Sequence, residues 1–445
     1  MATLRPLISC EQCGSLYFRA ALRPGERAAC QTCGTELWRH SGLTVSGWLA
    51  LTLGALVVFI IANAYPVASM SVQGRVQQAS LLDALAVTWE QGHLLVAAMS
   101  ALAAFFLPLL QLLLLAWVLY PLSQGRQAPG FATALRVLGL LRPWCMVPVF
   151  LLGVIVAVVK LAGMASISPN AGLGGFAVLT VLLTILGQLS PKAVWRYAED
   201  GRVVPIAEPP GGEGAILTAC HTCGQVQGLP AARPEEEHAC VRCDTRIHLR
   251  KPDHLTRTWA LLIAAAIMYI PANVLPVMII DSLTDTTRHT ILGGVIELWQ
   301  SGSWDLALIV FVASVVVPLT KLLSLALLAV AAGRGSVANL RQRTRLYTAV
   351  EFIGQWSMLD VFVVILLSAL AHFQGLMAIS AGPGAAPFGL VVVLTMLAAM
   401  TFDPRRGWDA ARERGLEIAE HGNDAAGGHR PPAASRPVPD APNAN

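Results

Sequence analysis

The feature that most constrains this 445-residue chain is an internal repeat, two copies of one pattern set 210 residues apart. The same offset relates Asn63 to Asn273 and Pro108 to Pro318. The repeat predicts one module used twice, a small cysteine cluster followed by long apolar segments. The clusters consist of Cys10, Cys13, Cys30 and Cys33 in the first copy and Cys220, Cys223, Cys240 and Cys243 in the second.

The long apolar segments predict a polytopic membrane protein. Hydrophobic residues make up 55% of the chain and charged residues only 13%, whereas soluble domains carry roughly 25% charged residues. A spanning helix needs roughly 20 apolar residues. We expect eight spans, in the ranges 43–64, 93–122, 144–167, 176–191, 257–280, 304–332, 350–374 and 386–402.

Positive charge is divided unequally between the two sides of these spans. One side holds 27 of the 31 Lys and Arg residues, the other holds Arg75 and Arg288, and Lys160 and Lys321 lie inside spans. Cytoplasmic loops carry such an excess of positive charge. The sequence therefore predicts that both termini and both cysteine clusters are cytoplasmic. The net charge of +4 follows from this bias, and no nucleic-acid motif accompanies it.

Each cysteine cluster has the pattern of a zinc ribbon. Two Cys-x-x-Cys pairs are separated by sixteen residues, and three of the four pairs are followed by Gly while the fourth is followed by Asp244. Gly, or less comfortably Asp, supplies the left-handed residue expected after the second cysteine of such a turn. Four thiolates suit one tetrahedral zinc ion, and a site without an open position is structural rather than catalytic. We therefore expect two structural Zn²⁺ ions. Disulfides and a redox pair are the alternatives, and the predicted cytoplasmic location and the absence of a βαβ pattern argue against them.

Together these features predict an all-α polytopic membrane protein of two tandem modules, each a small cytoplasmic zinc ribbon plus four transmembrane helices. The expected boundaries are a ribbon at 1–42, a membrane module at 43–200, a second ribbon at 201–256, a second membrane module at 257–404 and a mostly disordered cytoplasmic tail at 405–445.

The second membrane module contains a set of polar residues at apolar positions: Ser314, Lys321, Ser357, Asp360 and Thr395. Charged groups inside a span are costly, so they are expected to pair or to line a polar cavity. Ser314 and Lys321 are two helical turns apart and share a face. Pro318 between them, like Pro108 in the first copy, predicts a kink that frees a backbone carbonyl. Asn63 and Asn273 are expected to bond backbone groups at helix ends.

The first copy serves as an internal control for this set. Its equivalent residues carry no charged pair, and they are Ala104, Gln111, Cys145, Pro148 and Leu183. A pair needed only to build the module would be expected in both copies. The difference favours a functional role for Lys321 and Asp360, the alternative being a buried ion pair that locks two spans together.

The motifs absent from the sequence narrow its function. No G-x-x-x-x-G-K-[ST], H-E-x-x-H or G-x-S-x-G pattern occurs. We therefore expect no ATP hydrolysis by a P-loop and no enzymatic activity.

Several segments of the second copy resemble one known family. They are YIPANVLPVM (269–278), VVPLTKLLSL (316–325), IGQWSMLDVFVV (353–364) and VVVLTMLAAMTFDPRRGWD (391–409). With the paired ribbons they are similar to the paraquat-inducible protein A family of bacterial inner-membrane proteins, over about residues 5–410. The resemblance implies a partner with MCE (mammalian cell entry) domains, which forms a periplasmic tunnel for lipids between the two membranes.

The resemblance thus predicts an inner-membrane subunit that loads phospholipid into such a tunnel or receives it, and that supports outer-membrane integrity. Two other functions stay open at this point. One is an ion- or proton-coupled transporter of small molecules, which would need no MCE partner. The other is a membrane scaffold or redox sensor that acts through the zinc ribbons.

Overall fold

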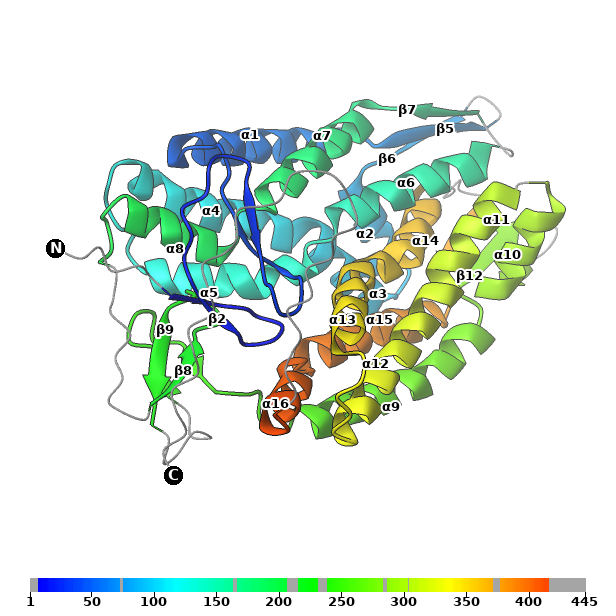
Figure 1. The fold of residues 1–445 in the computed structure, drawn as a ribbon. Coiled ribbons are helices and arrows are strands. Elements are labelled where there is room, and N and C mark those ends of the chain that lie inside the picture. Colours follow the sequence, from blue (N-terminus) through cyan, green and yellow to red (C-terminus); the bar gives the residue numbers. More distant parts are fainter. Residues whose placement is uncertain are drawn as a thin grey trace, which may run out of the picture.

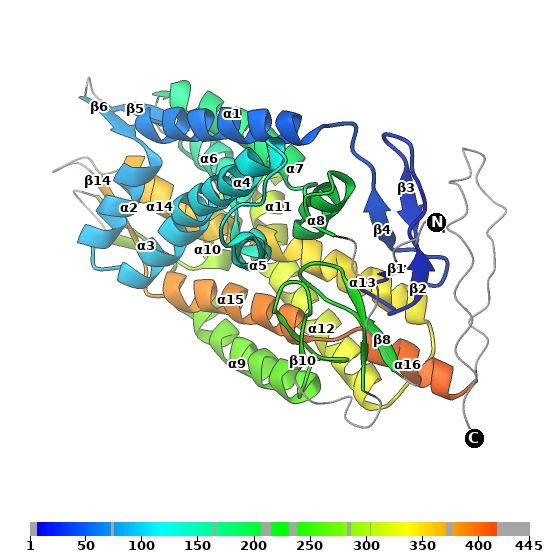
Figure 2. The ribbon, with the colours of Figure 1, turned by 90° about the vertical axis from the view of Figure 1, so that its left-hand side faces the viewer.

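The structure, a computed structural model, describes residues 7–72, 75–162, 166–205, 215–230, 238–282, 286–302, 304–370 and 377–415. Its helices run side by side, with the ribbon strands at one end of the bundle and the other strands at the opposite end (Figures 1 and 2). Of the expected tail, 405–445, the structure describes residues 405–415, where a helix forms at Arg405–Glu413, and the rest of the tail lies outside the described residues.

The first membrane module contains α1 (Val45–Ala64), α2 (Leu81–Glu90), α3 (Leu94–Ala101), α4 (Leu107–Ser123), α5 (Phe131–Leu141), α6 (Val147–Ala162), α7 (Ala171–Leu186) and α8 (Pro191–Asp200). A π-helical turn, η1 (Leu102–Phe106), joins α3 to α4, and a 3-10 turn, η2 (Arg142–Trp144), joins α5 to α6.

The second membrane module repeats this series with α9 (His254–Val274), α10 (Ile291–Gln300), α11 (Trp304–Phe311), α12 (Val317–Gly333), α13 (Leu340–Ile353), α14 (Leu359–Leu370), α15 (Ala385–Thr401) and α16 (Arg405–Glu413). The π-helical turn recurs as η3 (Val312–Val316) and the 3-10 turn as η4 (Gly354–Met358). The sequence repeat is therefore a repeat of structure.

The helices agree with a polytopic membrane fold. Each of the eight predicted ranges contains a helix. Within the described residues, six helices are long and apolar enough to cross a membrane, or seven if α7 and α8, bent by 58°, form one span. The remaining predicted range corresponds to α14, which is shorter. Exposed apolar side chains such as Ile60, Leu113 and Leu323 face outward along these helices, where the protein would contact lipid.

Two small sheets, which the sequence analysis did not anticipate, cap the end of the bundle opposite the ribbons (Figure 2). In the first, β5 (Ala68–Val72) lies between β6 (Arg75–Ala79) and β7 (Ser166–Pro169). In the second, β12 (Met278–Ser282) lies between β13 (Thr286–His289) and β14 (Met377–Ala381). All four pairings are antiparallel. Each sheet thus ties the loop after the first span to the loop before the last.

The two modules share one hydrophobic core. α6 packs against α14, where the rings of Phe150 and Phe362 meet edge to face at 5.6 Å. α2 also packs on α14, and there the hydroxyl of Ser368 donates to the side-chain oxygen of Gln91 at 2.9 Å. The Gln91 amide in turn donates to the carbonyl of Ile379 at 3.4 Å. The first module therefore makes both apolar and polar contacts with the second.

Candidate metal centres and polar site

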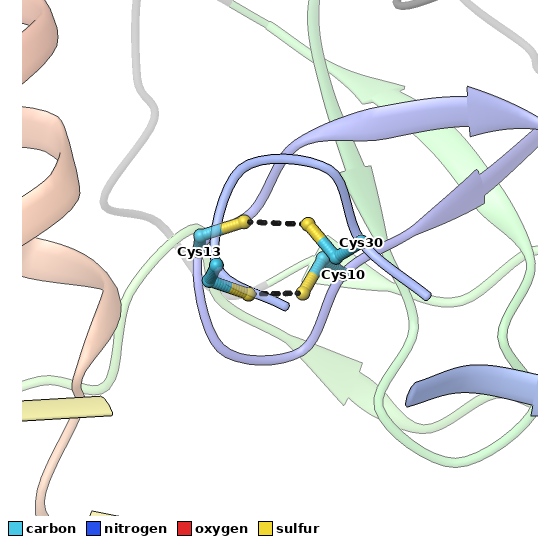
Figure 3. Close-up of side chains that lie close together, drawn as sticks. Cys10, Cys13 and Cys30 are labelled. Carbon is cyan, nitrogen blue, oxygen red and sulfur yellow. Dashed lines mark hydrogen bonds between the residues drawn. The ribbon is translucent and has the colours of Figure 1, made fainter. Parts of the chain in front are cut away.

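The first ribbon consists of two β-hairpins whose tips face each other. β1 (Leu7–Ser9) pairs with β2 (Leu16–Phe18), and β3 (Arg27–Ala29) pairs with β4 (Glu36–Arg39). Each tip carries a Cys-x-x-Cys turn, so the pairing brings four thiols from two distant segments to one point (Figure 3). The second ribbon repeats the design with β8 (Ile216–Ala219), β9 (Val226–Leu229), β10 (His238–Ala239) and β11 (Arg246–Ile247).

The spacing of the sulfur atoms suits a metal ion in both clusters. In the first, Sγ of Cys10 lies 3.5 Å from Sγ of Cys33, and Cys13 lies equally far from Cys30. The corresponding distances in the second are 3.5 and 3.6 Å. Four sulfurs at ~2.3 Å from a tetrahedral zinc ion would lie about 3.8 Å apart, whereas a disulfide bond is only ~2.05 Å long. The eight predicted ligands therefore form two groups that could hold metal, with all thiols free.

The residue after each second cysteine adopts the left-handed conformation that the sequence analysis expected. Its φ is 76° at Gly14, 80° at Gly34, 76° at Gly224 and 55° at Asp244. The amide of this residue donates to the carbonyl of the first cysteine of its pair, at 2.8–2.9 Å in all four turns. Asp244 forms the same turn as the glycines, so its presence does not change the geometry of the second cluster.

Each ribbon contacts a tryptophan of the membrane module that belongs to the other copy. Trp408, on α16 of the second module, lies in a buried group with the first cluster. The second cluster is part of the same core as Trp195, on α8 of the first module. Trp195 also stacks under the guanidinium of Arg242, at 4.3 Å. Sequence analysis did not predict this exchange, although Trp195 and Trp408 are equivalent positions of the repeat.

Some other charged contacts near the ribbons lie within one copy of the repeat. The carboxylate of Glu11 in the first ribbon pairs with Lys192 of α8, and this lysine lowers the pKa of Glu11. Lys251 lies in the segment before α9, where burial lowers its pKa. Its ammonium nitrogen donates to the carbonyls of Met400 and Phe402 at 2.6 and 3.0 Å, and so caps the end of α15.

The predicted polar site centres on Lys321. Its side chain is 1% exposed within α12, and its Nζ donates to the carbonyl of Gly354 at 3.4 Å. Ser314 is 0% exposed, and its hydroxyl donates to the carbonyl of Val310. The wider helical turn η3 ends at Val316, two residues before Pro318, which lacks the N–H that a regular helix would require there. A distortion beside the proline is therefore present, whereas the predicted kink stays a prediction.

The other predicted members lie on elements that converge on Lys321. η4, which carries Ser357, contacts η3, α12 and α15. Thr395 on α15 is buried, and its hydroxyl donates to the carbonyl of Val392. The side chains of Ser357 and Asp360 lie outside the described part of the chain. The elements η3, η4, α12 and α15 thus form one contacting group, while the grouping of the five side chains, the Lys321–Asp360 pair included, stays a prediction.

Gly354 is a member of this site that sequence reasoning missed. Its carbonyl accepts the hydrogen bond from Nζ of Lys321, and a Cβ at this position would lie in ordinary van der Waals contact with that nitrogen, at 3.4 Å. The sequence gives little indication of this role, because a single glycine near Trp356 can have many different structural roles. In the first module, Gln111 occupies the Lys321 position and is also buried. No hydrogen-bond partner of its side-chain oxygen is found among the described residues.

Both membrane modules match the model of one known protein family. The family model for paraquat-inducible protein A matches residues 45–199 and 255–412, one match for each membrane module. The chain belongs to the paraquat-inducible protein A family. The resemblance inferred from the second copy is therefore confirmed, and so is a mostly helical membrane fold with two four-cysteine modules.

Two relatives in this family come from Escherichia coli strain K12. The chain is 35% identical to "Intermembrane transport protein PqiA" over 91% of its own length and 96% of that protein. It is 28% identical to "Lipophilic envelope-spanning tunnel protein A" over 90% of its own length and 91% of that protein. No solved structure matches the chain.

Proposed function

We propose that this protein is the inner-membrane subunit of an MCE-type intermembrane lipid transport system. In this role it loads phospholipid into a periplasmic tunnel protein or receives phospholipid from it, and it supports outer-membrane integrity. The names of its relatives, an intermembrane transport protein and a lipophilic envelope-spanning tunnel protein, support transport between membranes. Both names describe transport rather than catalysis, which agrees with the expectation that the chain is not an enzyme.

The observation that carries the proposal is the burial of Lys321 in the second module. A buried ammonium group is costly unless it has a partner, and its one hydrogen bond among the described residues is the long contact with Gly354. A phospholipid phosphate is a suitable partner, because it pairs with a lysine as a point charge. We assign the working site to Ser314, Lys321, Ser357, Asp360 and Thr395, with Asp360 balancing the charge when no lipid is bound.

The same proposal assigns two structural zinc ions to the ribbons. Each cluster groups four buried cysteines, with no further His, Cys or carboxylate ligand beside them in the described part of the chain, and this matches the ligand set of structural zinc. Metal analysis of the purified protein should give about two zinc ions per chain. Iron in their place, or oxidised cysteines without metal, would contradict this assignment.

The lipid-transport role is tested by exploiting the difference between the copies. Lys321→Ala and Asp360→Ala should each abolish complementation of outer-membrane integrity while protein level and binding of the MCE partner stay near wild type. Gln111→Ala, at the equivalent position of the first module, is the matched control and should retain activity. Failure of an MCE protein to co-purify, with transport of a small molecule instead, would favour an ion-coupled transporter.

A double variant separates a working site from a structural pair. Removing one member of a buried ion pair can cost ~3–5 kcal/mol, whereas replacing both with apolar residues is often tolerated. If Lys321→Met combined with Asp360→Leu restores activity, the two residues only hold the helices together and the site assignment is wrong. A stable, partner-bound but inactive double variant supports the assignment.

A further inference from the structure

An arginine of the second membrane module reaches into the first cysteine cluster. Nη2 of Arg412, on α16, donates to the carbonyl of Cys13 at 2.8 Å and to the hydroxyl oxygen of Ser15 at 3.1 Å. That hydroxyl lies 3.2 Å from Sγ of Cys13. Because Ser15 accepts from Arg412, its own proton is free to be donated to a Cys13 thiolate. Arg412 thus contacts one ligand residue both directly and through Ser15.

The second cluster has the same local arrangement, built from the first membrane module. Arg136, on α5, donates to the carbonyl of Cys243 at 2.7 Å and to the hydroxyl oxygen of Thr245 at 3.1 Å. The Thr245 hydroxyl lies 3.2 Å from Sγ of Cys243. In both cases the hydroxyl belongs to the residue two places after the cysteine. The two arginines, however, come from different elements, so the sequence repeat alone does not predict them.

Further hydroxyl groups extend the network in the first cluster. The Tyr17 hydroxyl lies 3.3 Å from Sγ of Cys30 and 3.1 Å from the Thr32 hydroxyl, which in turn lies 3.2 Å from Ser15. The second ribbon has Gln225, Gln227 and Arg242 at the positions of Ser15, Tyr17 and Thr32. The extended hydroxyl network is therefore a property of the first cluster.

We propose that each metal centre is completed by the membrane module of the other copy, through Arg412 for the first cluster and Arg136 for the second. Both arginines, with Ser15, Tyr17 and Thr245, are positioning residues: they orient and stabilise ligand thiolates without touching the metal ion. Hydrogen bonds to ligand atoms tune metal affinity, and their removal typically costs 10- to 100-fold. Metal binding in a ribbon and docking of that ribbon on the opposite module must then stabilise each other, because such coupling is reciprocal.

The arrangement gives the ribbons a role in holding the two modules together. The first ribbon precedes the first module in the chain but is bonded to α16, which follows the span that carries Thr395. Loss of metal from the first cluster should therefore loosen the cytoplasmic end of the second module, and loss from the second cluster should loosen the first. This inference depends on metal binding by the ribbons and not on the proposed transport of lipid.

The test follows metal loss from each cluster separately in the full-length protein. Zinc-loaded protein in detergent is incubated with a chelator and a maleimide, and the cysteine-containing peptides are then quantified by mass spectrometry. Thiols become reactive only after the metal leaves, so labelling of residues 10–33 and 220–243 reports the two clusters independently.

Substitutions of the two arginines should have opposite effects on the two clusters. Arg412→Gln should accelerate labelling of the first cluster about 10-fold and leave the second unchanged, whereas Arg136→Gln should do the reverse. Tyr17→Phe removes one hydroxyl with little effect on shape, and it should accelerate only the first cluster.

Three results would overturn the proposal: equal acceleration of both clusters by either arginine variant, unchanged rates in both variants, or wild-type protein without metal. If an arginine variant does not fold, Tyr17→Phe and Thr245→Val still test the proposal, since each should accelerate labelling of its own cluster only. Because no step measures transport, a failure here is distinct from a failure of the proposed lipid-transport function.

Discussion

Individual residues carry much of the difference between the two modules. Asn63 and Asn273 have the same role, since each side-chain amide donates to a carbonyl four residues earlier, at 2.8 Å. Lys321 and Gln111 occupy equivalent buried positions, but only the former can carry a charge. Residues that shape the fold are thus retained in both copies, while the residues of the polar site are not.

A close approach between two segments depends on the absence of one side chain. Gly172, at the start of α7, lies against the chain that leaves α1, and a Cβ there would come within 2.4 Å of the carbonyl oxygen of Tyr65. Gly172→Ala should therefore force the backbone apart and destabilise the protein by about 1–3 kcal/mol, measured as a lower midpoint of thermal unfolding in detergent. Gly174→Ala is the control, because nothing lies within 4 Å of its Cβ position; equal loss in both variants would contradict the explanation.

At the scale of elements, the helix ends nearest the ribbons carry contacts that the spans themselves lack. Apart from the residues of the predicted polar site, the spans are largely apolar, so their sequences specify little beyond length and burial. At the ribbon end, α16 docks on the first ribbon and Lys251 caps α15.

Lys251→Met tests the capping of α15. The variant loses two charged hydrogen bonds to carbonyls at the helix end, and stability should fall by about 1–2 kcal/mol. Arg257→Met, at an exposed position of the neighbouring helix, should have almost no effect. An effect of Arg257→Met as large as that of Lys251→Met would show that loss of positive charge, and not capping, is responsible.

The lowered pKa of Lys251 predicts how the stability of the protein changes with pH. Burial lowers the pKa of Lys251, so between this lowered value and the ordinary value of about 10.4 the unfolded state binds more protons than the folded state. The contribution of Lys251 to stability should therefore rise as the pH rises through that window. Chemical unfolding of wild type and Lys251→Met at several pH values should show a widening difference; a difference that shrinks would contradict the shift.

At the scale of the whole molecule, the two ends of the bundle differ in composition. The ribbons lie at one end, and the two three-stranded sheets lie at the other (Figure 2). In the sequence, 27 of the 31 Lys and Arg residues belong to the ribbons, to the segments that join spans on the predicted ribbon side, and to the tail. This distribution supports the proposal that the ribbons and both termini are cytoplasmic and that the sheets face the periplasm.

Cysteine labelling tests this orientation. Thr287→Cys, exposed on β13, should react with an impermeant maleimide in intact cells, because the proposed topology places that sheet in the periplasm. Ala338→Cys, exposed between α12 and α13, should react only after the cells are lysed. Reaction of Ala338→Cys in intact cells would invert the proposed topology.

The local pattern of the sequence was sufficient for most of the architecture. The repeat, the positions of the spans and both sets of metal ligands were predicted, because each depends on a run of residues or a short spacing. The left-handed turn after each cysteine pair and the asparagine bonds at the helix ends were predicted for the same reason. The lysine of the polar site was identified because a charge in an apolar span is costly wherever the span packs.

The contacts between distant segments became visible only in the folded chain. The two sheets join strands about 100 residues apart, and short strands such as β7 and β14 have no partner in their own neighbourhood. Arg412 and Cys13 are separated by 399 residues, and nothing in either local sequence indicates their contact. Such contacts depend on how the modules pack, and packing is a sum of many weak apolar contacts that no short segment encodes.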